Sequence, residues 1–209
     1  MSAFLMRGRG ARRAAGAVMS VIWGLAAWPV AAGASPVVEG PAVVVPKTTI
    51  PGSGTYVVNK DFQAGVYRSV GNSSCYWQRA TDATGATSSI IANDIGGGQR
   101  LVYVKPTDKV FKSSSCKAWT KVTAAAMSVK STRTAIAGNG VYFVGSDFVP
   151  GTYRSSANKA YCYWERSRSA DGASSNIIAN EIAQGQLVVT ITPGGVFKSS
   201  GCTTWTKIG

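Results

Sequence analysis

The residue types that most enzymes use for acid–base or nucleophilic chemistry are scarce in this chain of 209 residues. It contains no histidine, which removes Ser-His-Asp and Cys-His arrangements and the usual ligands of zinc hydrolases. Acidic residues recur at two equivalent positions of the chain, Asp61 and Asp147 at one and Asp94 and Glu181 at the other. Each copy thus has two carboxylates, and glycosidases use two carboxylates for catalysis. A turn aspartate that bonds its own backbone is the simpler explanation of Asp61. We therefore predict a non-enzymatic protein, with a hydrolase using Asp61/Asp94-type carboxylates as a remote alternative.

The four cysteines are expected to pair, which would leave no thiol as a nucleophile. Four cysteines in an exported chain allow three pairings, and an internal duplication selects Cys75–Cys116 and Cys162–Cys202. Each bridge would close a loop of about 40 residues and stabilise the fold by roughly 3.5–4 kcal/mol. A zinc site would lack both the C-x-x-C spacing and a histidine partner, so we predict no metal and no cofactor.

Aromatic and basic side chains are the better functional candidates. We expect Tyr76 and Tyr163 to face outward, beside Arg79 and Arg166. Flat aromatic surface with nearby cations can stack on sugar rings or bind an anionic polymer, although ordinary cross-strand pairing also explains the tyrosines. Further outward cations are expected at Arg68, Arg154, Lys112 and Lys198.

The elements that must position these side chains occur twice. Residues 50–122 align with residues 136–208, with about half of the aligned positions identical and one extra residue in the second copy near Tyr161. Each copy is about 70 residues long, close to the lower limit for a core without a covalent staple. The chain is therefore a tandem duplication of one small module.

Short runs rich in Val, Ile, Tyr, Trp and Thr, separated by Gly, Asn, Asp and Ser, predict strands rather than helices. The segments "NDIGGGQ" (93–99) and "PTD" (106–108) look like hairpin connections. The predicted fold class is all-β: two tandem small β-barrel or sandwich modules of about six short strands, with one disulfide in each. The strands predicted in the first copy are 55–58, 66–70, 75–80, 88–93, 100–105 and 109–113.

The period of two along a strand assigns the inner face of each module. A face that carries Cys75 and Trp77, or Cys162 and Trp164, should point into the core. The isoleucines of both "IIAN" stretches should fill the same core. Inward positions are also expected for Tyr67, Tyr153, Phe111 and Phe197, and core packing near the disulfide is expected for Trp119 and Trp205.

The N-terminal part has the layout of a secretory signal, with four arginines, an uncharged stretch and an A-x-A cleavage site at 32–34. An uncleaved anchor is the alternative, and a membrane is a partner only in that case. The predicted domains are a signal peptide (1–34), a Pro/Val-rich tether (35–50), module one (51–122), a loop-like linker (123–136) and module two (137–209).

After removal of the signal, 18 Lys and Arg would face nine Asp and Glu. Such a balance favours a cell-wall polymer, a glycan or another polyanion as partner, although it also fits an ordinary basic exported protein. Nucleic acid is the least expected of the anionic partners. The main rival hypothesis is a secreted effector or inhibitor that binds an extracellular protein. Either way, we expect a secreted or envelope-associated location.

The frame "G-x-Y-F-V-G-S-D-F-V-P-G-T-Y-R-S … C-Y-W-E-R … I-I-A-N … V-F-K-S-S-G-C-x-x-W" (140–205) resembles a module of exported proteins in high-GC Gram-positive bacteria. Such modules occur alone, in tandem or attached to other exported domains. The resemblance covers both repeats and implies export, but it implies no mechanism. Copy one departs from the pattern, because "VVNKDFQAG" (57–65) lacks the glycine and proline of copy two.

Overall fold

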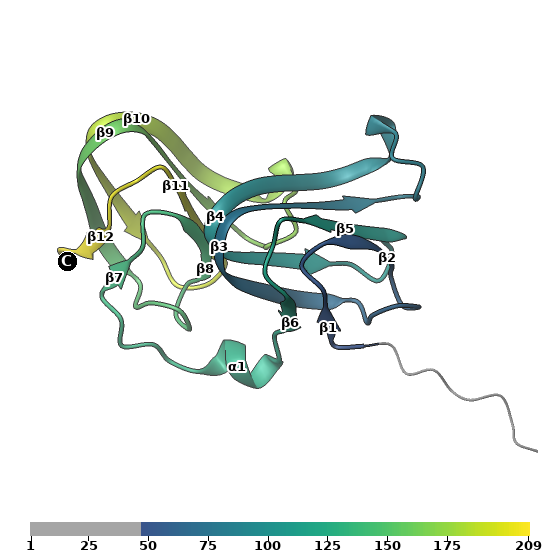
Figure 1. Cartoon of the computed structure of the whole chain (residues 1–209). Helices are drawn as coiled ribbons and strands as arrows, with labels where there is room; N and C mark the ends of the chain where they lie inside the picture. The colour runs from purple at the N-terminus through teal and green to yellow at the C-terminus, as the bar shows by residue number, and fades with distance from the viewer. Residues whose placement is uncertain (1–46) are drawn as a thin grey trace, which may run out of the picture. The chain divides into compact units, whose positions relative to one another are not determined.

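The computed structural model describes residues 47–209, which form two all-β modules of six strands each (Figure 1). The predicted signal peptide (1–34) and the tether up to residue 46 lie outside the described residues. The first module contains β1 (Thr49–Ile50), β2 (Gly54–Val57), β3 (Gly65–Ala80), β4 (Ile90–Val104), β5 (Val110–Ser114) and β6 (Trp119–Lys121). The second contains β7 (Ala135–Ile136), β8 (Gly140–Phe143), β9 (Gly151–Ser167), β10 (Ile177–Ile191), β11 (Val196–Ser200) and β12 (Trp205–Lys207).

One long antiparallel ribbon organises the first module. β3 pairs with β4 from Gly65 opposite Val104 to Ala80 opposite Ile90, with register shifts in the middle. The other edge of β3 pairs with β6 near its start and with β5 near its end. β1 extends the β6 side and β2 extends the β5 side. The ribbon therefore belongs to two small layers at once, and the core lies between them.

The second module repeats this plan with β9 and β10, which arch together in Figure 1. β9 has 17 residues where β3 has 16, and the extra residue falls at the bend, as the alignment predicted. Tyr161, at this bend, is 66% exposed. The irregular middle of the ribbon therefore accepts an insertion without changing the pairing at either end.

The predicted hairpin at 93–99 is wrong, because β4 runs through it without reversing. Glycine supplies the backbone freedom for a bend as readily as for a turn, and Gly98 has a φ of 74°. The segment 106–108 is a turn between β4 and β5, but those strands pair with β3 rather than with each other. Four of the predicted short strands therefore merge into two long ones.

The shortest elements were not predicted. β1, β6, β7 and β12 have two or three residues each, too few for a period of two to show. β1 and β7 occupy the last residues of the segments predicted as tether and linker. The linker also contains helix α1 (Ala124–Ser128), whose first turn is capped by the Thr123 hydroxyl accepting from the Ala126 N–H at 3.2 Å.

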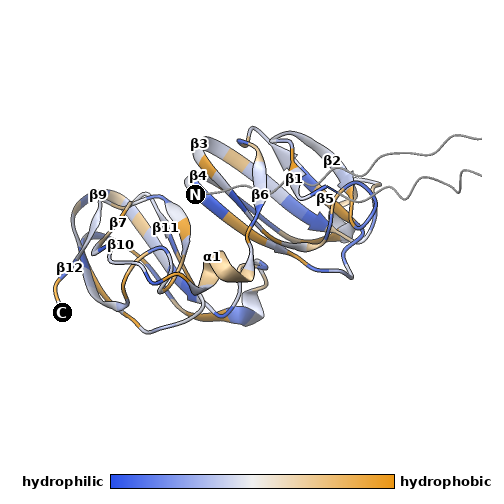
Figure 2. Cartoon of the chain, turned by 90° about the horizontal axis from the view of Figure 1, so that it is seen from below, coloured by the Kyte–Doolittle hydropathy of each residue, from blue (hydrophilic) through white to orange (hydrophobic). Residues whose placement is uncertain are grey.

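The predicted inner faces are confirmed in both modules. The inward residues named from the strand period are all 8% exposed or less, and apolar and polar residues alternate along the strands (Figure 2). Trp119 and Trp205 are fully buried, and each indole N–H donates to a serine hydroxyl at 2.9 Å, Ser113 or Ser199. These serines donate in turn to the carbonyls of Gly52 and Gly138, so each tryptophan is linked to the loop between the first two strands of its module.

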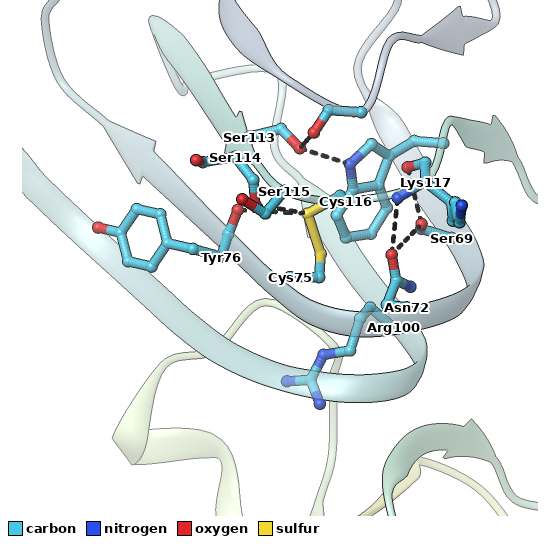
Figure 3. Close-up of a disulfide and its surroundings, with 12 residues drawn as sticks. Ser69, Asn72, Cys75, Tyr76, Arg100, Ser113, Ser114, Ser115, Cys116 and Lys117 are labelled. Carbon is cyan, nitrogen blue, oxygen red and sulfur yellow. Dashed lines mark hydrogen bonds between the residues drawn. A yellow bond between two sulfur atoms is a disulfide. The ribbon is translucent and has the colours of Figure 1, made fainter.

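Both predicted disulfides are confirmed: Cys75–Cys116 and Cys162–Cys202. Each joins the bend of the long strand, β3 or β9, to the segment that connects β5 with β6 or β11 with β12. Figure 3 shows the polar cluster beside the first of them, where the Asn72 amide accepts from the Lys117 N–H at 2.7 Å. The same amide donates to the Gly98 carbonyl at 2.9 Å. Asn158 makes the same two contacts in the second module, with Thr203 and Gly185.

The two modules belong to one compact unit and share a small apolar interface. Its buried residues are Leu101 of the first module and Val141, Ala170 and Val196 of the second, flanked by Tyr103 and Phe143. A parallel bridge joins β4 to β8. A Cβ on Gly98 would lie 2.2 Å from the Asn139 carbonyl oxygen, so the second module rests directly on the bend of the first.

We predict that Asn72→Ala lowers the free energy of unfolding by about 1–3 kcal/mol, because it leaves part-buried backbone groups of Lys117 and Gly98 without partners. Chemical denaturation with the disulfides intact measures the loss. Ser73→Ala, a change at an exposed neighbour, is the control and should be neutral. Equal stabilities of the two variants would contradict this role for Asn72.

Candidate functional site

Ion pairs between the modules consume much of the acidic charge of the described residues. Three of them cross the interface: Arg68 to Asp147, Lys105 to Asp171 and Lys198 to Asp94, each at 2.7 Å. Asp94 also accepts from Arg100, whose side chain is 1% exposed. Burial in this pair lowers the pKa of Arg100, while the Asp94 charge counteracts that effect.

Arg79 was predicted at the surface and is instead buried, at 1% exposure. It donates to both carboxylate oxygens of Asp108, at 2.6 and 2.8 Å, and to the main-chain carbonyl of Asp171 in the second module. The physical reason lies in the pleat, since residue 79 shares a strand face with Cys75 and Trp77. Arg79 therefore fastens the modules together and is not available to an outside partner.

The other predicted contact cations differ in exposure between the two copies. Arg68 and Lys198 are half-buried in ion pairs across the interface. Their counterparts in the alternate copies, Arg154 and Lys112, are exposed. Arg166 is half-buried and donates to the Thr192 hydroxyl. The duplication thus yields one structural and one outward version of the same basic position.

This arrangement leaves a strongly basic surface. The five ion pairs of the described residues use Asp94, Asp108, Asp147 and Asp171. Of the 18 Lys and Arg between residues 47 and 209, five are in these pairs and thirteen are not. Only four acids of that range lie outside the ion pairs. Outside the ion pairs, cations therefore outnumber acids 13 to 4, compared with 18 to 8 over residues 47–209 as a whole.

The two predicted tyrosines lie in matching settings, and both are half-buried. The Tyr76 hydroxyl donates to Gln78 at 2.7 Å and accepts from Asn93 at 3.4 Å. Tyr163 makes the same contacts with Glu165, at 2.6 Å, and with Asn180, at 3.4 Å. Burial, together with the hydrogen bond to Glu165, raises the pKa of Tyr163 to about 12, so this phenol is neutral at physiological pH.

Isoleucines flank each tyrosine on the same outer side of the ribbon, a feature that was not predicted. Ile95, opposite Tyr76 in the ladder, is 63% exposed and Ile182, opposite Tyr163, is 62% exposed. The expectation that all "IIAN" isoleucines fill the core is wrong, because Ala92 takes the inner position. The alternation around Ala92 was the available signal. We define the tyrosine faces as Tyr76, Ile91, Asn93 and Ile95, and as Tyr163, Ile178, Asn180 and Ile182.

Cations lie beside both tyrosine faces. The Lys198 ammonium is 5.7 Å from the centroid of the Tyr163 ring, within range of a cation–π interaction. Lys112 stands opposite Gln78 in the β3–β5 ladder and so shares the side of Tyr76. Each face therefore combines aromatic, aliphatic and basic groups.

Three of the acids named from the sequence have backbone or ion-pair partners, and the fourth, Glu181, accepts from the Trp164 indole N–H at 3.2 Å. Asp61 accepts from the Val57 N–H and Asp147 from the Phe143 N–H, each at 2.7 Å, in keeping with the turn interpretation. Asp94 is in the ion pairs described above. Among residues 47–209 no group of three or more His, Cys, Asp and Glu side chains could hold a metal ion.

These features define a class of protein: paired, disulfide-stapled β-modules with a basic outer surface. The chain belongs to the family of Rv1352-like extracellular domains, whose model matches residues 48–120 and 134–206. The protein is therefore extracellular and contains that domain twice. No curated protein and no solved structure matches the chain. In the part that the structure describes, no helix is long and apolar enough to cross a membrane.

We predict that the interface between the modules becomes less stable in acid, because Asp171 is protonated there. Burial opposes ionisation of this group, but hydrogen bonds from Lys105, Asn176 and Ala173 outweigh it and lower its pKa. A lowered pKa in the folded state stabilises the protein above the unfolded value, about 3.9, and this stabilisation is lost as the pH falls through the folded value. The stability of Asp171→Asn should therefore change less than that of wild type below about pH 4.

Urea unfolding at pH 6 and at pH 3, about one unit below the ordinary pKa, measures the difference. Lys105→Met, which removes the cationic partner, should reduce the pH dependence in the same direction. Identical pH profiles for wild type and Asp171→Asn would contradict the role of this carboxylate.

Proposed function

We propose that this protein is a non-enzymatic extracellular or cell-envelope binding protein that adheres to an anionic or glycan surface through basic and aromatic side chains. The supporting observation is the distribution of charge. The interface holds the paired acids, while thirteen of the described Lys and Arg lie outside ion pairs. A surface with such an excess attracts polyanions over several ångströms and concentrates them near the protein.

The natural partner of this chemistry is a phosphate- or carboxylate-bearing wall polymer. The resemblance to exported modules of high-GC Gram-positive bacteria supports such an envelope. Exposed cations occur on both modules, among them Lys112 and Lys117 on the first and Arg154 and Lys159 on the second. Because each exposed contact is individually weak, a repetitive polymer that meets many of them at once is favoured over a small anion.

The tyrosine faces would add a sugar-binding component to this adhesion. Each presents a half-buried ring with exposed isoleucines beside it, and the same residues occur at the four matching positions of both modules. An aromatic ring next to aliphatic groups can pack against the apolar side of a pyranose. Two such faces in one chain would raise the apparent affinity for a repeating glycan.

A secreted protein-binding effector is the second candidate, and the exposed isoleucines are the observation that favours it. Ile95 and Ile182 are both more than 60% exposed beside a tyrosine. Exposed aliphatic and aromatic groups together mark protein interfaces as well as glycan sites. In that case the partner would contact the tyrosine faces rather than the scattered cations.

The test is binding of the full chain to cell-wall pellets and to a glycan array at increasing salt. Binding should fall steeply with ionic strength, and Lys112→Glu with Arg154→Glu should weaken it. The charge-conserving pair Lys112→Arg and Arg154→Lys is the matched control and should bind like wild type. Salt-insensitive binding to a single protein, abolished by Ile95→Asp or Ile182→Asp, would overturn the proposal in favour of the second candidate.

A further inference from the structure

The contact between the two modules is head-to-tail, so each of its two surfaces has a counterpart that the contact does not use. The first module offers β4, and the second receives it with β8 and the turn after β8. The counterparts lie on β10 and β2, which among the described strands pair only with β9 and β5. The residues of these two free surfaces are all exposed. We call them the β10 side (Arg154, Glu181, Gly185, Gln186 and Val188) and the β2 side (Ser53, Thr55, Val57, Asp61 and Lys112).

A polar cluster around Asp147 makes the internal contact. Its carboxylate accepts from Arg68 at 2.7 Å and from the Gln99 amide at 2.9 Å. The equivalent residues on the free surfaces are of the same types: Asp61, Arg154 and Gln186. A carboxylate on the β2 side therefore matches a guanidinium and an amide on the β10 side.

A second ion pair of the internal contact also has its charges repeated. Lys198 pairs with Asp94 at 2.7 Å, and their counterparts are Lys112 on the β2 side and Glu181 on the β10 side. Glu181 accepts from the Trp164 indole N–H through Oε2, and a carboxylate has two oxygens that can accept. Two of the three ion pairs across the interface can therefore form again between two chains.

The backbone of β10 has the shape that lets β4 approach the second module closely. Gly98 and Gly185 have φ angles of 74° and 79°. A Cβ on Gly98 would lie 2.2 Å from the Asn139 carbonyl oxygen, whereas a Cβ on Gly185 would meet nothing within 4 Å. On the receiving surfaces Gly140 and Gly54 share a φ of 148°. The bend of β10 is thus ready for a close contact that the described residues do not make.

A contact between chains is weaker than the internal one. The pair of Lys105 with Asp171 has threonines at both counterpart positions, and Leu101 is replaced by the smaller Val188. The linker also holds the two modules of one chain together, and short linkers give effective concentrations on the order of millimolar. Association of separate chains therefore requires a high protein concentration.

We propose that the chain self-associates head to tail, with the β10 side of one copy bound to the β2 side of the next. The two ion pairs and the amide contact of the internal interface form again between chains, and Val188 packs against Val57. Because the two surfaces differ, the contact is heterologous and extends from chain to chain. The inference goes beyond the proposed adhesion, although a repetitive polymer that gathers many chains would favour both.

Sedimentation equilibrium of the full chain at low salt measures the average mass as the protein concentration rises. For wild type the mass should rise beyond that of a dimer, and added salt should reduce it. Gly185→Asn should lower the association constant by about tenfold or more, because its side chain meets the Ser53 carbonyl of the next chain. Asparagine tolerates the positive φ at this position.

Gly71→Asn is the matched control for Gly185→Asn. Its φ is 72°, and a Cβ there would meet nothing within 4 Å. Its counterpart Ala157 already has a side chain at a φ of 59°. Because residue 71 lies on neither free surface, this variant should associate like wild type.

A mixture of two variants tests the head-to-tail direction. Val57→Asp blocks the β2 side with a charge and Gly185→Asn blocks the β10 side, so each alone should stay monomeric where wild type associates. Mixed in equal amounts, they should form dimers and nothing larger, because each supplies the surface that the other has lost. Val70→Asp, at a β3 position that is 56% exposed, is the control for the added charge and should associate like wild type.

Thr84→Asp combined with Thr192→Lys is a gain-of-association variant. It recreates between chains the pair that Lys105 and Asp171 form within one chain, and should raise the association constant by about two- to fivefold. Thermal unfolding checks that all variants are folded. A wild type that stays monomeric up to about millimolar concentration, or a mixture no larger than its components, would overturn the inference.

Discussion

The bend in the long β-ribbon is the constraint on which each module depends. A ribbon of about fifteen residues per strand must serve two layers, so its middle has to turn while its ends keep their pairing. Cys75–Cys116 ties this bend to the crossing segment, and Asn72 satisfies the backbone groups that the bend leaves exposed to the interior. The recurrence of both devices in the second module, at Cys162–Cys202 and Asn158, indicates that they are inseparable parts of the fold.

Part of the interface between the modules uses positions at which the repeats differ. Asp171 and Lys105 pair across it, whereas their counterparts are Thr84 and Thr192, both exposed. Leu101 is 1% exposed at the interface, and its counterpart Val188 is 47% exposed. A head-to-tail contact between identical repeats would propagate from chain to chain. Because the repeats differ at these positions, the matching partners face each other only where a first module meets a second module.

The same divergence links the architecture to the proposed activities. The fold places acidic side chains in ion pairs at the junction, and the cations outside these pairs are left to contact a polyanion. With Asp94 in the place of Glu181, the buried indole N–H of Trp77 has no acceptor among the described residues, whereas that of Trp164 donates to Glu181.

The sequence by itself determined the duplication, the all-β class, the pairing of the cysteines and the inner faces, because each follows from local periodicity or from comparison of the two copies. It did not determine that the glycines at 96–98 bend a strand, since a glycine-rich run permits a bend and a turn equally. It also misplaced Arg79, whose partners Asp108 and Asp171 lie 29 and 92 residues away. Only the tertiary structure decided these points, because the burial of a strand face depends on what packs against it. Here that neighbour is the second copy of the same module.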